Sequence, residues 1–163
     1  MKKSLKFLFS TVIALIMFSA CSKEVENNTP QYAEKNVIVT LSYGGAYENY
    51  EEMIGIQIIG SNVENTTVDG VEWTNTSRPD KLAAQFQRIG DASGSLTLRT
   101  TKPISGCTLI GSFIPKDVIE VEEPMTVNVK YFIEDKLVKT DNFSTGDGKD
   151  SYEGILVIND YIE

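Results

Sequence analysis

The sequence predicts an all-β fold, an antiparallel β-sandwich of the immunoglobulin-like kind. Short runs in which apolar and polar residues alternate recur along most of the chain, and such alternation is typical of half-buried strands. Gly, Pro, Asn and Asp separate the runs at intervals of about 8 to 12 residues, which is typical of sandwiches and barrels. A closed β-barrel is therefore the alternative architecture.

The alternating runs place the expected strands at residues 37–43, 54–58, 71–73, 95–99, 107–114, 118–122, 126–133, 136–143 and 154–158. The clearest is 126–133, where Val127, Val129 and Tyr131 share one face. Glu134 and Asp135 follow it and predict a hairpin turn. The run at 107–114 differs, because Ile110 and Ile114 lie on the face opposite Leu109. We expect that strand to be buried on both faces.

One stretch, residues 79–89, fits a short helix. Leu82, Phe86 and Ile89 form a helical stripe, residues 77–80 resemble a capping box, and Gly90 suits a C-terminal cap. Leu82, Ala84 and Phe86 also alternate, so a strand is the alternative.

The first 21 residues predict export and lipid anchoring. Three lysines precede an apolar run at residues 7–18 that is shorter than the ~20 residues of a membrane-spanning helix, which is typical of a signal peptide. Phe18-Ser19-Ala20-Cys21 resembles the lipobox of bacterial lipoprotein precursors. The resemblance implies cleavage before Cys21 and acylation of Cys21 with chains such as palmitate. An ordinary secretory signal, with Cys21 incidental, is the alternative.

The resemblance also implies a location. Ser22 is not the aspartate that retains many lipoproteins in the inner membrane, so an outer-membrane lipoprotein is expected. Residues 22–26 partly resemble the acidic segment that follows the cysteine in surface lipoproteins of Bacteroidetes. We therefore expect display either at the surface or toward the periplasm.

The chain is expected to divide into a signal peptide (1–20), a flexible polar tether (21–35) and one all-β domain (36–163). Removing residues 1–20 removes three of the 15 basic residues and none of the 23 acidic ones, so the net charge becomes about −11. An acidic domain repels phosphate backbones, so nucleic acid is not an expected partner.

The composition excludes several chemistries. The chain has no histidine, so His-based hydrolysis, haem ligation and the usual zinc sites are ruled out. Once Cys21 is acylated, Cys107 is the one cysteine left and cannot form an internal disulfide. Its place beside Leu109 predicts a buried, inert thiol. We expect a protein without a cofactor that is not an enzyme.

Candidate ligand-binding residues are Tyr43, Tyr47, Asn49, Tyr50 and Trp73. Tyrosines offer rigid amphipathic surface, and Asn can bond hydroxyl groups, as in many binding loops. The alternative is that these tyrosines cover one end of the sandwich and that Trp73 belongs to the core.

Asp141, Asp147 and Asp150 are candidate calcium ligands, because they lie around glycines in one loop. Their spacing does not match the calcium-loop template, and a solvated turn is the alternative.

These observations predict a membrane-anchored envelope lipoprotein whose β-sandwich binds or adheres to a glycan or protein ligand. One alternative is an envelope inhibitor or immunity protein that blocks a protease or toxin through loops on a rigid scaffold. A second alternative is a hydrolase that uses paired carboxylates.

Overall fold

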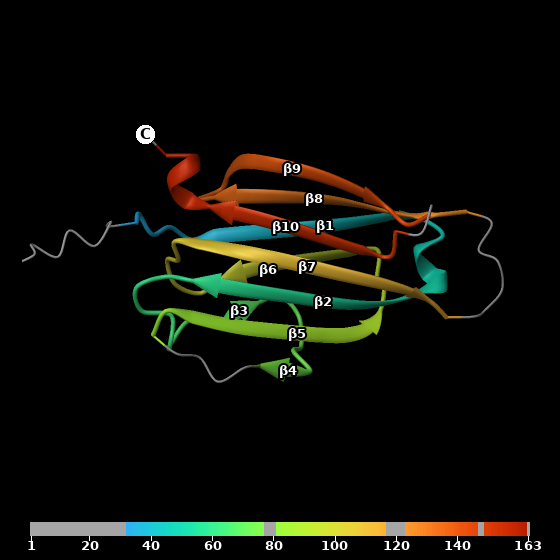
Figure 1. Ribbon diagram of the computed structural model, residues 1–163, viewed down its shortest axis with the longest axis horizontal. Helices are drawn as coiled ribbons and strands as arrows, with labels where there is room; N and C mark the ends of the chain where they lie inside the picture. Colours follow the sequence, from blue (N-terminus) through green and yellow to red (C-terminus); the bar gives the residue numbers. More distant parts are fainter. Residues whose placement is uncertain (1–31, 77–80, 117–122, 147–148, 163) are drawn as a thin grey trace, which may run out of the picture. The chain divides into compact units, whose positions relative to one another are not determined.

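The strands lie in two antiparallel five-stranded sheets that face each other (Figure 1). The computed structural model describes residues 32–76, 81–116, 123–146 and 149–162. The first sheet has the order β3 (Val68–Asp69), β6 (Ser95–Thr100), β1 (Val37–Gly45), β8 (Met125–Ile133), β9 (Lys136–Ser144). The second has the order β10 (Ser151–Val157), β7 (Gly106–Pro115), β2 (Tyr50–Ile59), β5 (Ala83–Asp91), β4 (Asn75–Thr76). The sandwich prediction is confirmed, and the barrel alternative is wrong.

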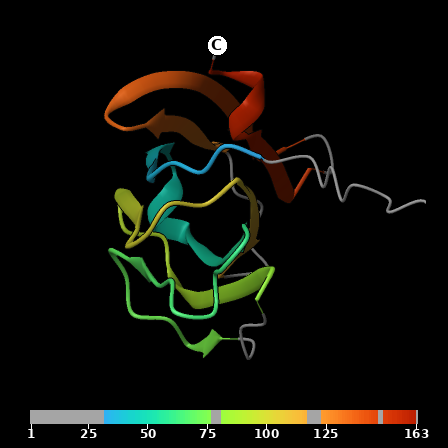
Figure 2. The same ribbon diagram turned by 90° about the vertical axis from the view of Figure 1, so that its left-hand side faces the viewer.

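Two single-turn 3₁₀ helices, η1 (Tyr47–Asn49) and η2 (Ile158–Asp160), complete the described elements. Figure 2 looks along the strands, with the β8–β9 hairpin at one edge of the sandwich and β4 at the other. Within the described residues we find no helix with the length and apolarity that a membrane span needs. The expected signal peptide, Cys21 and most of the tether lie outside the described residues.

The core is built from the inward residues of both sheets, as the alternating pattern predicts. Leu41, Ile56, Leu109, Val129 and Leu156 are each no more than 1% exposed. Fully burying one such side chain stabilises the fold by about 1.5–3 kcal/mol. The core therefore follows directly from the period-2 pattern of the sequence.

The predicted hairpin at residues 134–135 is confirmed. Both Glu134 (φ 48°) and Asp135 (φ 67°) adopt left-handed backbone conformations, as a two-residue type I′ turn requires. Strands β8 and β9 pair directly across it.

Three local predictions are wrong. Residues 83–91 form strand β5 rather than a helix, because they pair along their whole length with β2; residues 79–80 lie outside the described residues. Val71 and Trp73 lie between β3 and β4 rather than in a strand. Strand β7 is buried on one face only, since Ile110 and Ile114 are exposed. The strand expected at 118–122 lies outside the described residues.

Cys107 is the buried thiol that the sequence predicts. It is 2% exposed, and burial raises the pKa of its thiol to about 12. At neutral pH the reactive thiolate is therefore scarce.

A polar network joins the two sheets where β9 lies next to β10. The hydroxyls of Tyr131 and Tyr152 are 2.8 Å apart, and the Tyr152 hydroxyl donates to Asp141 Oδ2 at 2.6 Å. Lys139 Nζ contacts the same carboxylate at 2.8 Å and donates to the Ile155 carbonyl at 3.0 Å. Burial alone would raise the pKa of Asp141, but the hydrogen bonds from Lys139 and Tyr152 outweigh it and lower the pKa.

Candidate functional site

The candidate site lies where the chain crosses from one sheet to the other between β3 and β4. The crossing begins at Gly70, whose φ is +120° and whose added Cβ would lie 1.8 Å from the Thr97 carbonyl oxygen. Only glycine suits this position. The crossing ends where the Thr74 backbone N–H donates to the Gln87 carbonyl at 2.9 Å. Both ends of residues 70–74 are thus held against strands.

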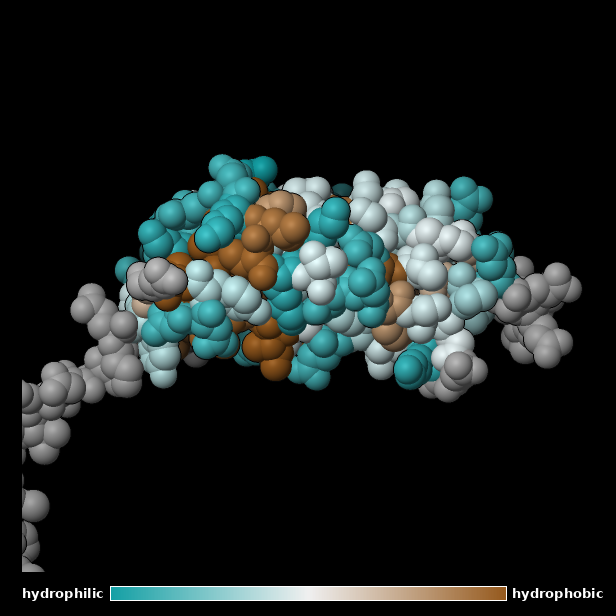
Figure 3. Space-filling view, turned by 90° about the horizontal axis from the view of Figure 1, so that it is seen from above, coloured by the Kyte–Doolittle hydropathy of each residue, from teal (hydrophilic) through white to brown (hydrophobic). Residues whose placement is uncertain are grey.

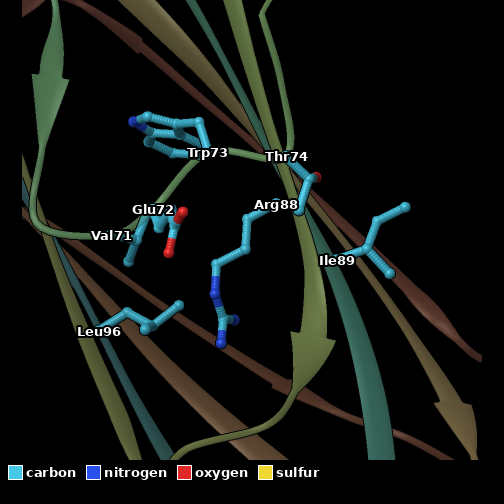
Figure 4. A pocket seen from close by; sticks show the side chains of 7 residues that line it. All are labelled: Val71, Glu72, Trp73, Thr74, Arg88, Ile89 and Leu96. Atoms are coloured by element: carbon cyan, nitrogen blue, oxygen red, sulfur yellow. The ribbon is translucent and has the colours of Figure 1, made fainter.

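This crossing segment forms one wall of a pocket of about 450 Å³. The lining residues are Val71, Glu72, Trp73, Thr74, Arg88, Ile89 and Leu96. In Figure 4, Arg88 extends toward the side of Leu96 and Glu72, whereas Ile89 points to the opposite side of β5. The volume lies in the range of small-molecule sites.

Trp73 is held rigidly in the pocket wall. Its ring centroid lies 5.6 Å from that of Phe86, with the rings tilted by 48°. Its indole N–H donates to the Val68 carbonyl at 2.5 Å. Trp73 is half-buried, so it packs on the core and also borders the pocket. Its packing on the core is therefore shown, whereas ligand binding by Trp73 stays a prediction.

Arg88 is held from behind by a buried carboxylate. Arg88 Nη1 is ion-paired with Oε1 of Glu52, and Arg88 Nη2 donates to the Asp91 carbonyl at 3.3 Å. Glu52 is 1% exposed. Gly90 lies opposite Glu52 on β5, and an added Cβ there would be 3.3 Å from Arg88 Nη2. The absence of a side chain at Gly90 leaves room for the guanidinium group.

The buried carboxylate is incompletely compensated. Burial raises the pKa of Glu52, although nearby Tyr43 and the charge of Arg88 lower it in part. Glu52 Oε2 and the Tyr43 hydroxyl are both buried, and neither has a hydrogen-bond partner with good geometry among the described residues. Removing this carboxylate from water costs desolvation energy that the Coulombic attraction of Arg88 only partly offsets.

The predicted tyrosines do not gather into one binding loop. Tyr43 and Tyr50 are 9% and 5% exposed and belong to the core. Tyr50 accepts a hydrogen bond from the Thr145 hydroxyl at 3.1 Å. Tyr47 is half-buried, with its ring centroid 6.3 Å from that of Tyr43, and Asn49 is exposed beside it. Of the predicted residues, Trp73 alone lines the pocket.

The two calcium candidates that the structure describes, Asp141 and Asp150, have different surroundings. Asp141 contacts Lys139 and Tyr152, as described above, and Asp150 is exposed just before β10. Asp147 lies outside the described residues. Among the described residues we find no group of three or more His, Cys, Asp or Glu side chains that could hold a metal ion.

Sequence reasoning missed Arg88 and Glu52, although a signal was present. Glu52 alternates with Ile54 and Ile56 and so lies on their face of β2. Arg88 likewise lies on the same face of β5 as Phe86. A charge at an inward position of an alternating strand indicates a buried pair.

No family model matches the chain, and no curated protein matches its sequence. Solved structures do resemble it. A DUF4425 family protein from Bacteroides ovatus and a DUF4425 domain from Bacteroides vulgatus align with TM-scores of 0.54 and 0.53, each at 12% identity. The alignments cover 76% of this chain and 95% and 96% of theirs. This likeness shows the fold alone.

A third structure is the calcium-bound form of a protein from Parabacteroides distasonis. It aligns with a TM-score of 0.50 at 18% identity, over 78% of this chain and 98% of that one. All three similar proteins come from Bacteroides or Parabacteroides, and all three share the arrangement of a β-sandwich domain.

Proposed function

We propose that this protein is a lipid-anchored envelope protein whose β-sandwich binds a glycan and performs no reaction of its own. The observation that carries the proposal is the pocket beside Trp73. It combines a rigid aromatic wall, aliphatic surface from Val71 and Leu96, and the polar groups of Glu72, Thr74 and Arg88. Sugars present apolar ring faces and many hydroxyls, and such a lining complements both.

The charges of the pocket favour a neutral ligand. The positive charge of Arg88 is matched by Glu52, so an anion finds no uncompensated cation there. The net charge of the whole chain, −8, further opposes anionic ligands. Arg88 can still donate to hydroxyl oxygens, and Glu72 can accept from hydroxyl groups. Thr74 Oγ1 can also accept from them, since its own hydrogen is donated to the Gln87 carbonyl at 3.1 Å.

The pocket also favours binding over turnover. Glu52 is held by Arg88 behind the pocket lining, and Glu72 is the one carboxylate in the lining. Carboxylate-based hydrolysis of glycosides needs a pair of carboxyl groups on either side of the scissile bond. The lining supplies one.

Trp73→Ala tests the binding proposal. We expect the chain from Ser22 onward to bind at least one glycan on an oligosaccharide array, and we expect Trp73→Ala to weaken that binding by about 1–3 kcal/mol through the lost ring contact. Thr126→Ala, on the outward face of the first sheet, is the matched control and should bind normally. A glycan signal that Trp73→Ala leaves unchanged, or no signal for any glycan, would contradict the proposal.

Cys21→Ala tests the anchor. With the full chain in its own envelope, Cys21→Ala should abolish incorporation of a labelled fatty acid, because acylation requires the thiol. Cys107→Ala is the matched control, since the chain has two cysteines and Cys107 is buried. Two or three acyl chains, each contributing about 0.8 kcal/mol per buried CH₂, would hold the protein firmly. Labelling that persists in Cys21→Ala would refute the anchor.

A further inference from the structure

The outward face of the second sheet carries most of the large apolar side chains that the described residues expose, and polar residues lie between them. Five isoleucines on this face, each between 42% and 60% exposed, are Ile59, Ile89, Ile110, Ile114 and Ile155. They come from β2, β5, β7 and β10 and therefore cover the width of the sheet. Figure 3, which looks onto the β9–β10 edge and not onto this face, shows hydrophobic residues reaching the surface mainly in one half of that side.

The outward face of the first sheet has one apolar row, Ile38, Phe132 and Leu137, and is polar over its centre. Its central outward positions carry hydroxyl and amide side chains: Thr40, Ser42, Thr97, Thr126, Asn128 and Asn142. An antiparallel sandwich normally exposes such polar residues on both outer faces. Several exposed apolar residues on one face instead favour an interaction site.

An open position and a protruding side chain lie side by side near the centre of the outward face of the second sheet. Gly55 on β2 pairs with Ile110 on β7. A Cβ added to Gly55 would meet nothing closer than the Phe86 carbonyl oxygen at 3.9 Å, so the surface above Gly55 is open. Ile110, next to it, is 42% exposed.

We propose that this face, called the isoleucine face from here on, binds the isoleucine face of a second copy of the chain. A two-fold axis parallel to the strands, midway between β2 and β7, exchanges these two strands. It brings Ile110 of each copy over Gly55 of the other. Such an isologous contact is self-complementary, as two-fold interfaces must be.

The charges of the isoleucine face permit this pairing. Glu153 lies in the same row as Ile110 and Gly55, and Gln87 lies at the other end of that row. The two-fold axis therefore places Glu153 of one copy opposite Gln87 of the other. Glu51 and Ile114 are paired neighbours on β2 and β7. The axis therefore places Glu51 of one copy opposite Ile114 of the other. No carboxylate of these rows faces another, which would otherwise cost affinity.

The size of the face suits a weak dimer. Four strands at about 4.8 Å spacing and nine residues at about 3.4 Å rise give roughly 19 Å by 27 Å in projection. This projected area of about 500 Å² per copy lies below the ~800 Å² that standard interfaces bury and fits a weak association. A second copy is thus the occupant that the two-fold fit and the charges of the face support.

Sedimentation equilibrium over the micromolar range tests the proposal. The chain from Ser22 onward is suitable, because Tyr32–Glu163 is one compact unit with its own core. We expect a monomer–dimer equilibrium for the unsubstituted chain. Ile110→Asp should weaken dimerisation by about tenfold or more, because it places an unpaired carboxylate at the centre of the contact.

Two further variants make the test specific. Thr126→Asp adds the same charge to the polar face of the first sheet and should leave the dimer intact. Gly55→Leu makes the isoleucine face more apolar but fills the open position, so it should weaken the dimer if the fit is specific. Circular dichroism confirms that each variant is folded. A monomeric unsubstituted chain, or a Gly55→Leu dimer as tight as the unsubstituted one, would overturn the proposal.

Discussion

Arg88→Met is expected to lower the free energy of unfolding by about 3–5 kcal/mol, because it leaves the carboxylate of Glu52 buried without its cation. Glu52 is 1% exposed, so its carboxylate has little access to water of its own. Met keeps most of the aliphatic stem that packs between the sheets. Urea unfolding followed by tryptophan fluorescence measures the loss, and Trp73 is the single tryptophan.

The loss of unfolding free energy in Arg88→Met should increase as the pH rises from about 4.5 to neutral. Burial already raises the pKa of Glu52 above its ordinary value of 4.5, and removing Arg88 raises it further. A carboxyl whose pKa is higher in the folded state binds its proton more tightly when folded, so stability falls as the pH rises from about 4.5 through the folded pKa. Arg88→Met should therefore be worst at neutral pH and approach the unsubstituted chain as the pH falls toward 4.5.

Two controls separate this effect from a general loss of charge. Arg99→Met removes an exposed arginine on β6 and should change the unfolding free energy by less than about 0.5 kcal/mol. The double variant Glu52→Gln/Arg88→Met removes the stranded carboxylate and should recover a large part of the stability. A pH-independent loss in Arg88→Met, or no recovery in the double variant, would contradict the buried-pair explanation.

Gly154→Ala is expected to lower the unfolding free energy by about 3 kcal/mol, from overpacking together with lost hydrogen bonds. A Cβ at position 154 would lie 2.0 Å from the Tyr152 hydroxyl and 2.1 Å from the Tyr131 hydroxyl. Both hydroxyls belong to the network that joins β8, β9 and β10. The Tyr131 and Tyr152 hydroxyls would have to move away from the added methyl group, and this movement would disturb the hydrogen bond from Tyr152 to Asp141.

The same substitution in a Tyr131→Phe/Tyr152→Phe background is the matched control. Without the two hydroxyls, Gly154→Ala should lower the unfolding free energy by clearly less. The difference between the two backgrounds measures the coupling between the methyl group and the hydroxyls. Chemical denaturation at a single protein concentration gives both values. Equal costs in the two backgrounds would show that the hydroxyls are not the atoms that the methyl group displaces.

Part of the candidate site was predictable from sequence. Trp73 stood out as the single tryptophan of an otherwise acidic, β-branched chain, and the structure places it in the pocket wall. Tyr43 and Tyr50 stood out as well, but they are core residues, because both have inward positions on their strands. Arg88 reaches the pocket only through strand pairing between β5 and β2, which no local pattern of residues records.

The sequence by itself determined the class of fold and most of the core. Side chains alternate between the two faces of any strand, so the period-2 pattern predicts which residues point inward before the neighbouring strand is known. It also determined the hairpin at Glu134-Asp135 and the buried state of Cys107, because turn chemistry and face assignment are both local properties.

Only the tertiary structure decided what lies beside each strand. Residues 83–91 satisfy both a helical and a strand pattern, and the strand prevails because β2 offers a complete antiparallel partner. Ile110 and Ile114 are apolar in sequence wherever they lie, and their exposure follows from the absence of a described layer over the second sheet. Contacts between residues far apart in the chain carry this information, and no window of sequence contains it.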